Sequence, residues 1–259
     1  MKAKIISFAS GKGGVGKTSI SLNTSLAFVD LGRKTLQVDL DFGLANVEVM
    51  LNIKPIVNMK DLPKLDYDFS RLILTGTWGL DIISCGRGFS WLNNLSHDQR
   101  KALLLSWRNF TEAYDVVVID SCPSLNVDAL FFLSMSDLVV IITTPEITAV
   151  LDAYVMLKTL ATRFHVKNFG LVVNKVKSPA EGSQIYEAFA GLAMSHLNVR
   201  LGYFGHVLLD DKVGESVRMR SPFFTQFPSS KASKCIRAIA NLLLEELILE
   251  GCDEIVKYD

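Results

Sequence analysis

The amino-acid sequence predicts an α/β fold in which a mostly parallel, twisted sheet carries helices on both faces. Two observations lead to this prediction. Short runs of apolar and β-branched residues recur along the chain, and stretches with helical spacing of apolar residues lie between most of them. Uninterrupted apolar strands are typical of parallel sheets that helices cover on both sides. The expected strands are residues 5–8, 35–38, 80–83, 116–119, 138–142, 169–173 and 201–207.

The expected helices follow from apolar spacing and from signals at the helix ends. Leu22, Leu26 and Val29 share one face of a helix, and Gly32 supplies its C-cap. A capping box that begins at Ser96 opens the next helix. Apolar residues recur at helical spacing in three more stretches, which are residues 147–157, 185–196 and 234–250.

Length and composition favour a single domain over residues 1–259, in which residues 234–259 form a C-terminal helix and a short acidic tail. Of the 259 residues, 49% are hydrophobic and 21% are charged, which is enough apolar material for one large core. Lys plus Arg equals Asp plus Glu at 27 each, so no overall basic excess indicates nucleic acid or an anionic membrane. No run reaches the roughly 20 apolar residues of a membrane span. We expect a cytoplasmic protein.

A phosphate-binding loop follows the first expected strand. Its residues match the pattern G-x-x-x-x-G-K-[ST], with a strand before the loop and a helix after it. The glycines let backbone N–H groups surround phosphate oxygens, and the helix N-terminus favours negative charge. We expect Lys17 to bind the β- and γ-phosphates and the Thr18 hydroxyl to bind Mg²⁺. The nucleotide-binding residues predicted in this loop are Gly11, Lys12, Gly13, Gly14, Val15, Gly16, Lys17, Thr18 and Ser19.

Carboxylates end two of the expected strands. Asp39 and Asp41 stand two residues apart where the second strand ends, and Asp120 ends the strand at residues 116–119. The carboxyl ends of parallel strands meet at one edge of a sheet, so these side chains are expected to face the same crevice. Such carboxylates hold an attacking water or reach Mg²⁺ through its waters. The expected metal site therefore comprises Thr18, Asp120 and, in a supporting role, Asp39.

The base is predicted to be adenine. The sequence Asn174-Lys175-Val176-Lys177 is similar to the NKxD box that binds guanine, but Lys177 stands where that box has aspartate. Guanine recognition needs a carboxylate that accepts from two ring donors, and an ammonium has no acceptor. The Asn174 amide can still donate to and accept from the edge of adenine. ATP is therefore expected to bind in preference to GTP.

The phosphate loop, with an additional lysine at its start, resembles the deviant Walker A loop of the MinD/ParA ATPase family. In that family this lysine crosses a face-to-face homodimer, formed with ATP, to the nucleotide of the partner. The resemblance implies this role for Lys12 and a catalytic role for Lys17 within its own chain.

The same resemblance extends to the other conserved segments of the family. By position, Asp41 matches the catalytic residue of switch I that positions the attacking water. Residues 120–125 are similar to switch II, with Cys122 in place of a proline. Asp210 lies where family members close over the base, although Leu208 replaces the proline of that turn.

A narrower resemblance is to FlhG/FleN, the MinD-like regulators of flagellar number. Residues 143–154, 173–182 and 227–233 are similar to segments of that branch. The resemblance implies a protein that partners recruit to the cell pole or membrane. The partners it implies are an FlhF-type GTPase, flagellar switch or basal-body proteins, or a transcription regulator.

Two departures from this branch are expected to matter. FlhG-type proteins often carry an N-terminal activator segment, for which a first strand at residue 5 leaves no room. From Glu245 onward the chain has six acidic residues and one basic residue, so an anionic membrane should repel this tail. Membrane binding by the chain itself is not expected.

Together these observations predict an ATP-dependent dimerising ATPase, slow in hydrolysis, that regulates the placement or number of flagella. The alternative is a ParA-like partition ATPase that binds DNA nonspecifically. A non-hydrolysing adaptor and an iron–sulfur reductase also stay open, although the four cysteines lack CxxC spacing and are expected to be reduced thiols. A DNA-binding patch for the partition alternative would comprise Arg218, Arg220, Lys231, Lys234 and Arg237.

Overall fold

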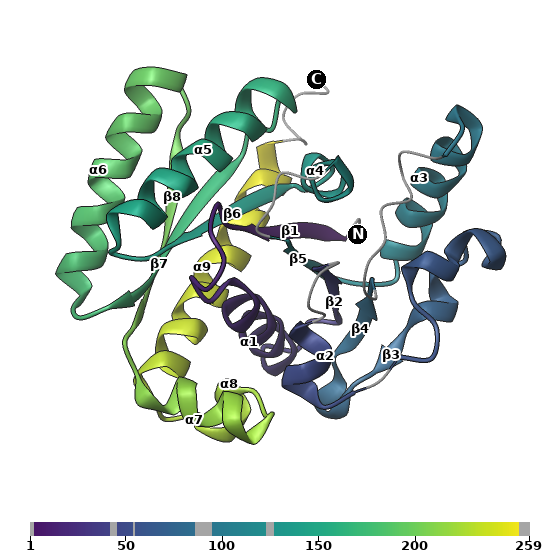
Figure 1. Ribbon diagram of the computed structural model, residues 1–259, viewed down its shortest axis with the longest axis horizontal. Helices are drawn as coiled ribbons and strands as arrows, with labels where there is room; N and C mark the ends of the chain where they lie inside the picture. The colour runs from purple at the N-terminus through teal and green to yellow at the C-terminus, as the bar shows by residue number, and fades with distance from the viewer. Residues whose placement is uncertain (1–2, 42–45, 54, 86–94, 123–126, 254–259) are drawn as a thin grey trace.

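A central sheet organises the chain, and the computed structural model describes it through residues 3–41, 46–53, 55–85, 95–122 and 127–253. Within these residues eight strands form one sheet in the order β3-β4-β2-β5-β1-β6-β7-β8 (Figure 1). All neighbouring strands are parallel except β3 and β4. The predicted fold class is confirmed. The strands are β1 (Lys4–Ala9), β2 (Thr35–Leu40), β3 (Leu74–Thr75), β4 (Asp81–Ser84), β5 (Val116–Ser121), β6 (Leu138–Thr143), β7 (Phe169–Val176) and β8 (Leu201–Leu208).

Helices connect most of these strands. The described α-helices are α1 (Lys17–Asp30), α2 (Asn46–Leu51), α3 (His97–Thr111), α4 (Val127–Ser134), α5 (Ile147–Arg163), α6 (Pro179–Leu197), α7 (Asp211–Met219), α8 (Phe223–Gln226) and α9 (Lys231–Asp253). Short 3₁₀ helices lie between α2 and β4, at Met59–Leu65, Phe69–Leu72 and Thr77–Gly79.

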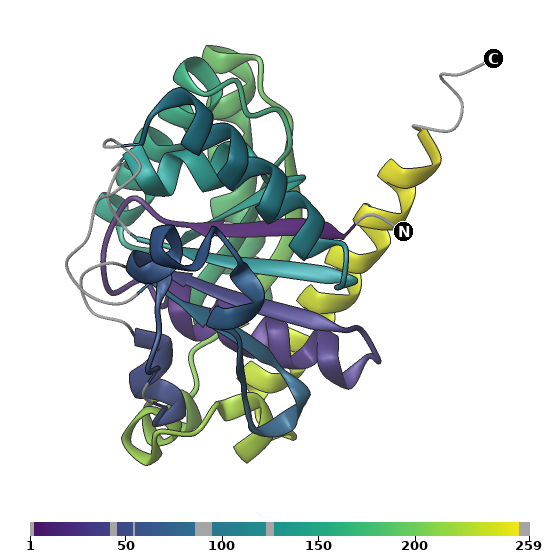
Figure 2. The same cartoon turned by 90° about the vertical axis from the view of Figure 1, so that its right-hand side faces the viewer.

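The two faces of the sheet are covered by different helices. On β5, Val116 and Val118 pack with residues of α1 and α9, whereas Val117 and Ile119 pack on the other face with α3. That other face continues under α5 and α6, which pack on β6 and β7. Figure 2 shows α9 running along one side of the sheet. This alternation explains the continuous apolar strands, because each successive side chain enters one of two cores.

The predicted helix ends are present. The Ser96 hydroxyl accepts from the backbone N–H of Gln99, whose side chain accepts from the backbone N–H of Ser96, so the capping box opens α3. Gly32 follows the C-cap of α1 with a φ of 77°, a left-handed conformation that glycine adopts without strain. The last helix begins at Lys231, earlier than the predicted residue 234, and residues 254–259 of the acidic tail lie outside the described residues.

Several details differ from the sequence pattern, which did not predict α2, α4, α7 and α8. Strand β3 was not predicted, since two residues carry no periodicity. The helix predicted at residues 147–157 is present as α5, but of the apolar residues that indicate it Ile147, Leu151 and Val155 are exposed while Leu157 is buried. No helix in the described ranges is long and apolar enough to cross a membrane. The single-domain interpretation stays a prediction.

Candidate nucleotide-binding site

The carboxyl ends of three neighbouring strands bring the predicted site residues together. Strand β5 lies between β2 and β1, and β1 leads into the glycine-rich loop before α1. In the parallel register, Asp120 of β5 lies opposite Asp39 of β2 and Phe8 of β1. The two carboxylates, which are 81 residues apart in the sequence, are therefore neighbours at the base of the loop.

The loop itself depends on glycine at several positions. Gly14 and Gly16 have φ angles of 81° and 91°, a conformation that side chains disfavour. A Cβ atom at Gly16 would lie 2.4 Å from the Asn174 side chain, and one at Gly11 would lie 2.0 Å from the carbonyl oxygen of Asp152 on α5. The chain is thus packed closely enough around the loop that only hydrogen fits at these positions. A glycine-rich loop that leads into a helix N-terminus is typical of a phosphate-binding site.

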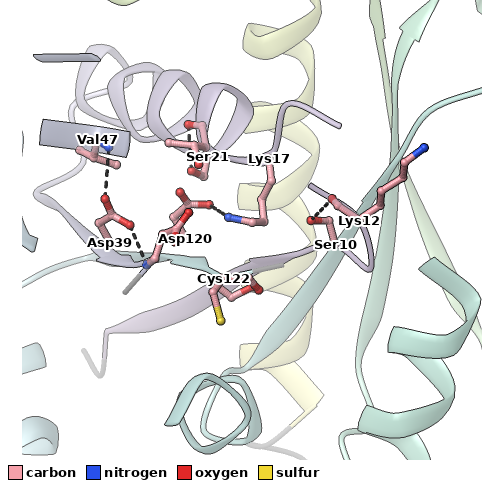
Figure 3. A network of polar contacts seen from close by, with 11 residues as sticks. Ser10, Lys12, Lys17, Ser21, Asp39, Val47, Asp120 and Cys122 are labelled. Carbon is pink, nitrogen blue, oxygen red and sulfur yellow. Dashed lines mark hydrogen bonds and ion pairs between the residues drawn. The ribbon is translucent and has the colours of Figure 1, made fainter. Parts of the chain in front are cut away.

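Lys17 and Asp120 form a buried ion pair inside this site (Figure 3). The ammonium of Lys17 donates to Oδ1 of Asp120 at 2.5 Å, and the two side chains are 6% and 0% exposed. The other carboxylate oxygen, Oδ2 of Asp120, is buried and has no hydrogen-bond partner among the described residues. A buried carboxylate oxygen without a partner is costly, which indicates that a ligand completes the site.

Asp39 supports the same site from β2. Its Oδ1 accepts from the backbone N–H of Asp41 at 2.9 Å, and its Oδ2 accepts from the backbone N–H of Val47 at 3.1 Å. Burial, followed by the charge of Asp120, raises the pKa of Asp39 to about 7, while the two backbone donors and Lys17 act to lower it. The carboxylate therefore ties the start of α2 to the end of β2.

Asp41 and Ser19 are two further predicted site residues that the structure describes. Asp41 is buried at the carboxyl end of β2, and residues 42–45, which follow it in the predicted switch I, lie outside the described residues. The hydroxyl of Ser19 is buried without a hydrogen-bond partner in the described part of the chain, and this residue lines a cavity. Residues 123–126 of the predicted switch II are also outside the described residues.

A cavity of about 500 Å³ adjoins the loop between α1, β7, β8 and α7. Gly16, Ser19, Asn174 and Asp210 line it, so the structure brings the predicted base-binding residues to one place. The sequence did not single out several apolar lining residues, since nothing in a helix or strand pattern separates them from ordinary core positions. They are Ile20, Val207, Val213 and Phe223, and Leu208, which stands in place of the proline of the family's turn, lines the cavity with them.

The two predicted base-binding side chains are bonded to the protein itself. The Asn174 amide donates to the carbonyl of Val15 at 2.7 Å and accepts from the backbone N–H of Lys175 at 2.8 Å. The Asp210 carboxylate accepts from the backbone N–H groups of Lys212 and Ala232, which open α7 and α9. Burial acts to raise the pKa of Asp210, but these donors outweigh it and hold the pKa below its ordinary value.

Lys12 lies in different surroundings from Lys17. Its ammonium is 2.9 Å from the Glu146 carboxylate and donates to the Thr148 hydroxyl at 3.0 Å, both at the start of α5. Figure 3 shows its side chain pointing away from the pair of Lys17 and Asp120. In this single chain the lysine predicted to reach a partner is bonded within its own subunit.

The residues present fit a magnesium-bound nucleotide. No group of three or more His, Cys, Asp or Glu side chains in the described residues is arranged to hold a metal ion by itself. Mg²⁺ differs from metals that need such a cage, because one or two carboxylates and the substrate phosphates usually bind it. The unpaired oxygen of Asp120 beside the phosphate loop is a donor of that kind.

Comparisons with known proteins identify the family to which the chain is similar. Residues 3–169 match the family model described as an AAA domain. The chain is 30% identical to the antiactivator FleN of Pseudomonas aeruginosa, covering 92% of this chain and 85% of FleN. It is also 30% identical to the flagellum site-determining protein YlxH of Helicobacter pylori, covering 94% and 83%. The cell division ATPase MinD of Pyrococcus furiosus superposes with a TM-score of 0.74 at 22% identity, over 94% and 99% of the two chains.

Proposed function

The chain belongs to this AAA-domain family, among its MinD/ParA ATPases and close to FlhG/FleN, and on that premise we propose that it is an ATP-dependent dimerising ATPase that regulates the placement or number of flagella. The observation that carries the ATPase proposal is the buried pair of Lys17 and Asp120 with its unpaired carboxylate oxygen. A lysine, a carboxylate and a glycine loop at one sheet edge are suited to binding a magnesium-bound triphosphate.

Each phosphate-site residue has a distinct role in this proposal. Lys17 neutralises charge on the phosphates, and to do so its ammonium turns from Asp120 toward them. Asp120 and the Thr18 hydroxyl would hold Mg²⁺, in part through water, and Asp39 keeps the end of β2 and the start of α2 in place. When bound, Mg²⁺ would supply further neutralisation of the phosphate charge. Asp41 would position the attacking water at the edge of the same site.

Dimerisation is the second part of the proposal. Two chains that face each other with bound nucleotides bring two clusters of negative charge together, and a lysine from the partner would reduce their repulsion. Lys12 suits this task because it is partly exposed and its bonds are to surface groups of α5. The flagellar role is supported by the similarity to FleN and YlxH along most of the chain.

Adenine is the proposed base. The Asn174 amide has a second N–H that its bond to Val15 does not use, and Lys177 is exposed at the position where guanine recognition requires a carboxylate. Calorimetric titration with Mg-ATP and Mg-GTP tests this part. Equal or tighter binding of GTP would contradict it.

The dimer cycle is tested with Asp41→Ala. Loss of the water-positioning carboxylate should leave ATP binding and dimer formation intact and stop hydrolysis, so that the dimer persists after ATP is added. Size exclusion with light scattering measures the dimer, and phosphate release measures hydrolysis. Normal hydrolysis by the variant would contradict the role of Asp41.

The flagellar role is tested in the native cell. Electron microscopy should show altered flagellar number or position when the chromosomal copy carries Asp41→Ala. Unchanged flagella together with salt-sensitive, ATP-dependent binding of DNA by the purified protein would favour the partition alternative instead.

A further inference from the structure

The end of β7 contacts the outside of the phosphate loop through two consecutive side chains. The Lys175 ammonium donates to the carbonyl oxygen of Gly14 at 2.8 Å. The Asn174 amide donates to the next carbonyl, that of Val15, at 2.7 Å. Two adjacent residues of one strand thus hold two adjacent carbonyls of the loop.

Fixing these carbonyls also fixes two N–H groups. In a planar trans peptide the carbonyl oxygen and the N–H hydrogen of the next residue point in opposite directions. When the carbonyls of Gly14 and Val15 point toward β7, the N–H groups of Val15 and Gly16 point away from it. An anion-binding loop needs its N–H groups directed at the ligand, and here β7 sets their direction from behind.

The backbone at Lys175 is distorted in a way that brings its side chain to the loop. In the pairing of β7 with β8, Asn174 lies opposite Val207 and Val176 lies opposite Leu208, so Lys175 is the extra residue of a bulge. Its φ is 58°, in the left-handed region that a residue with a Cβ disfavours. Bulges beside functional sites commonly redirect one side chain. An unfavourable conformation that is retained at such a position indicates a use for the side chain that it redirects.

We propose that Lys175 is a positioning residue, which together with Asn174 orients the Val15 and Gly16 amides toward the phosphates of the nucleotide. This inference rests on the proposed nucleotide binding and adds the residue that shapes the loop before the nucleotide arrives. Lys175 acts through the loop and not by touching the base. Loss of the Lys175 side chain should therefore lower the affinity for phosphate groups and leave the preference between adenine and guanine unchanged.

A matched pair of lysines provides the test. Lys177 is two residues further along the chain and also exposed, and within the described residues only its backbone N–H is bonded, to Glu181. Lys175→Met and Lys177→Met remove the same charge from neighbouring positions. Calorimetry with Mg-ATP, Mg-GTP and magnesium tripolyphosphate then measures the affinity of each variant.

Lys175→Met should bind ATP and tripolyphosphate each roughly tenfold more weakly than the parent, as expected for a lost hydrogen bond from a charged donor. Its ratio of ATP to GTP affinity should equal that of the parent, and Lys177→Met should bind all three ligands as the parent does. Parental tripolyphosphate affinity in Lys175→Met, or an equal loss in Lys177→Met, would overturn the inference. A parent that bound neither ATP nor tripolyphosphate would overturn the proposed function itself.

A second variant separates positioning from simple structural support. Lys175→Gly relieves the left-handed strain, so its melting temperature should equal or exceed that of the parent. Its tripolyphosphate affinity should nevertheless fall as in Lys175→Met, and the amides of Val15 and Gly16 should exchange hydrogen faster in the nucleotide-free protein. Parental affinity and exchange in Lys175→Gly would overturn the inference.

Discussion

The two lysines of the phosphate loop, five positions apart, lie in opposite environments. Lys17 is buried and paired with a carboxylate that has no exposed surface, whereas Lys12 and its partner Glu146 are 38% and 63% exposed. Breaking a buried ion pair leaves an uncompensated charge unless another charge replaces the lost partner, so the Lys17 ammonium can leave Asp120 only for an anion at the same site. Lys12 can exchange its surface bonds for others or for water at little cost. Lys17 is suited to bind a nucleotide in its own chain, and Lys12 is suited to extend toward a partner chain.

The largest effect is expected from Lys17→Ala. The change removes the ammonium from the phosphate site and leaves Asp120 buried without its partner, so ATP affinity should fall by about 100-fold or more. The nucleotide-free protein should also melt at a lower temperature. Calorimetric titration with Mg-ATP and thermal unfolding followed by circular dichroism measure the two effects. If the variant bound ATP as tightly as the parent does, the role of Lys17 in phosphate binding would be contradicted.

Lys12→Ala should separate binding from assembly. Because Lys12 is exposed, the variant should fold and bind ATP nearly as the parent does, while its ATP-dependent dimer weakens by about 100-fold and hydrolysis is lost with it. Sedimentation velocity with ATP over a range of protein concentrations measures the dimer. A variant that dimerises like the parent would show that Lys12 stays within its own chain.

Asp39→Asn tests how strongly the free energy of unfolding depends on pH through the buried carboxylate at the end of β2. The pKa of Asp39 is raised from 3.8 to about 7 in the folded protein, chiefly by burial. The folded state therefore binds this proton more tightly than the unfolded chain does. The stability that Asp39 contributes is full below about pH 4 and is lost as the pH rises through about 7. Between about pH 5 and about pH 7.5 the parent should lose more free energy of unfolding than Asp39→Asn does, as measured in urea. If the free energies of unfolding of the parent and of Asp39→Asn changed equally with pH, the raised pKa of Asp39 would be contradicted.

The smallest effect is expected from Glu146→Gln. This change removes the charge that holds Lys12 within its own chain, so dimerisation with ATP should become slightly stronger. The melting temperature should stay the same, because the pair is at the surface. The sedimentation assay used for Lys12→Ala provides the measurement. A weaker dimer would mean that Glu146 itself contacts the partner.

The sequence predicted most of the fold because its strands are continuous apolar runs buried on both faces. It missed β3, whose two residues have no pattern, and although it predicted α5 as a helix, it did not indicate which side of that helix is buried. In α5 both sides of the helix are apolar, with Ile147 and Leu151 outside and Met156 and Leu160 inside. Periodicity cannot choose between two apolar faces; the packing of neighbouring elements does.

The phosphate half of the site was predictable for a geometric reason. Asp39 and Asp120 each lie at the carboxyl end of a strand and Lys17 begins a helix, and parallel topology brings such positions to one edge. The contacts that the end of β7 and Asp210 make around this site were less predictable. The bond from Lys175 to Gly14 depends on a bulge, and the capping of two helices by Asp210 depends on where α9 returns to the sheet. Neither has a local sequence signal. The water-positioning role of Asp41 stays a prediction.

The register between β2 and β5 also limits how the length of this chain can vary. The strands pair without interruption from Thr35 with Val116 to Leu40 with Ser121, which places Asp39 opposite Asp120. Side chains alternate between the faces of a strand, so one inserted residue within β2 would turn Asp39 to the opposite face. A substitution in this strand changes one side chain and keeps the register, but an insertion or deletion would separate the two carboxylates. During evolution, changes in length should therefore accumulate in the loops and be purged from β2 and β5.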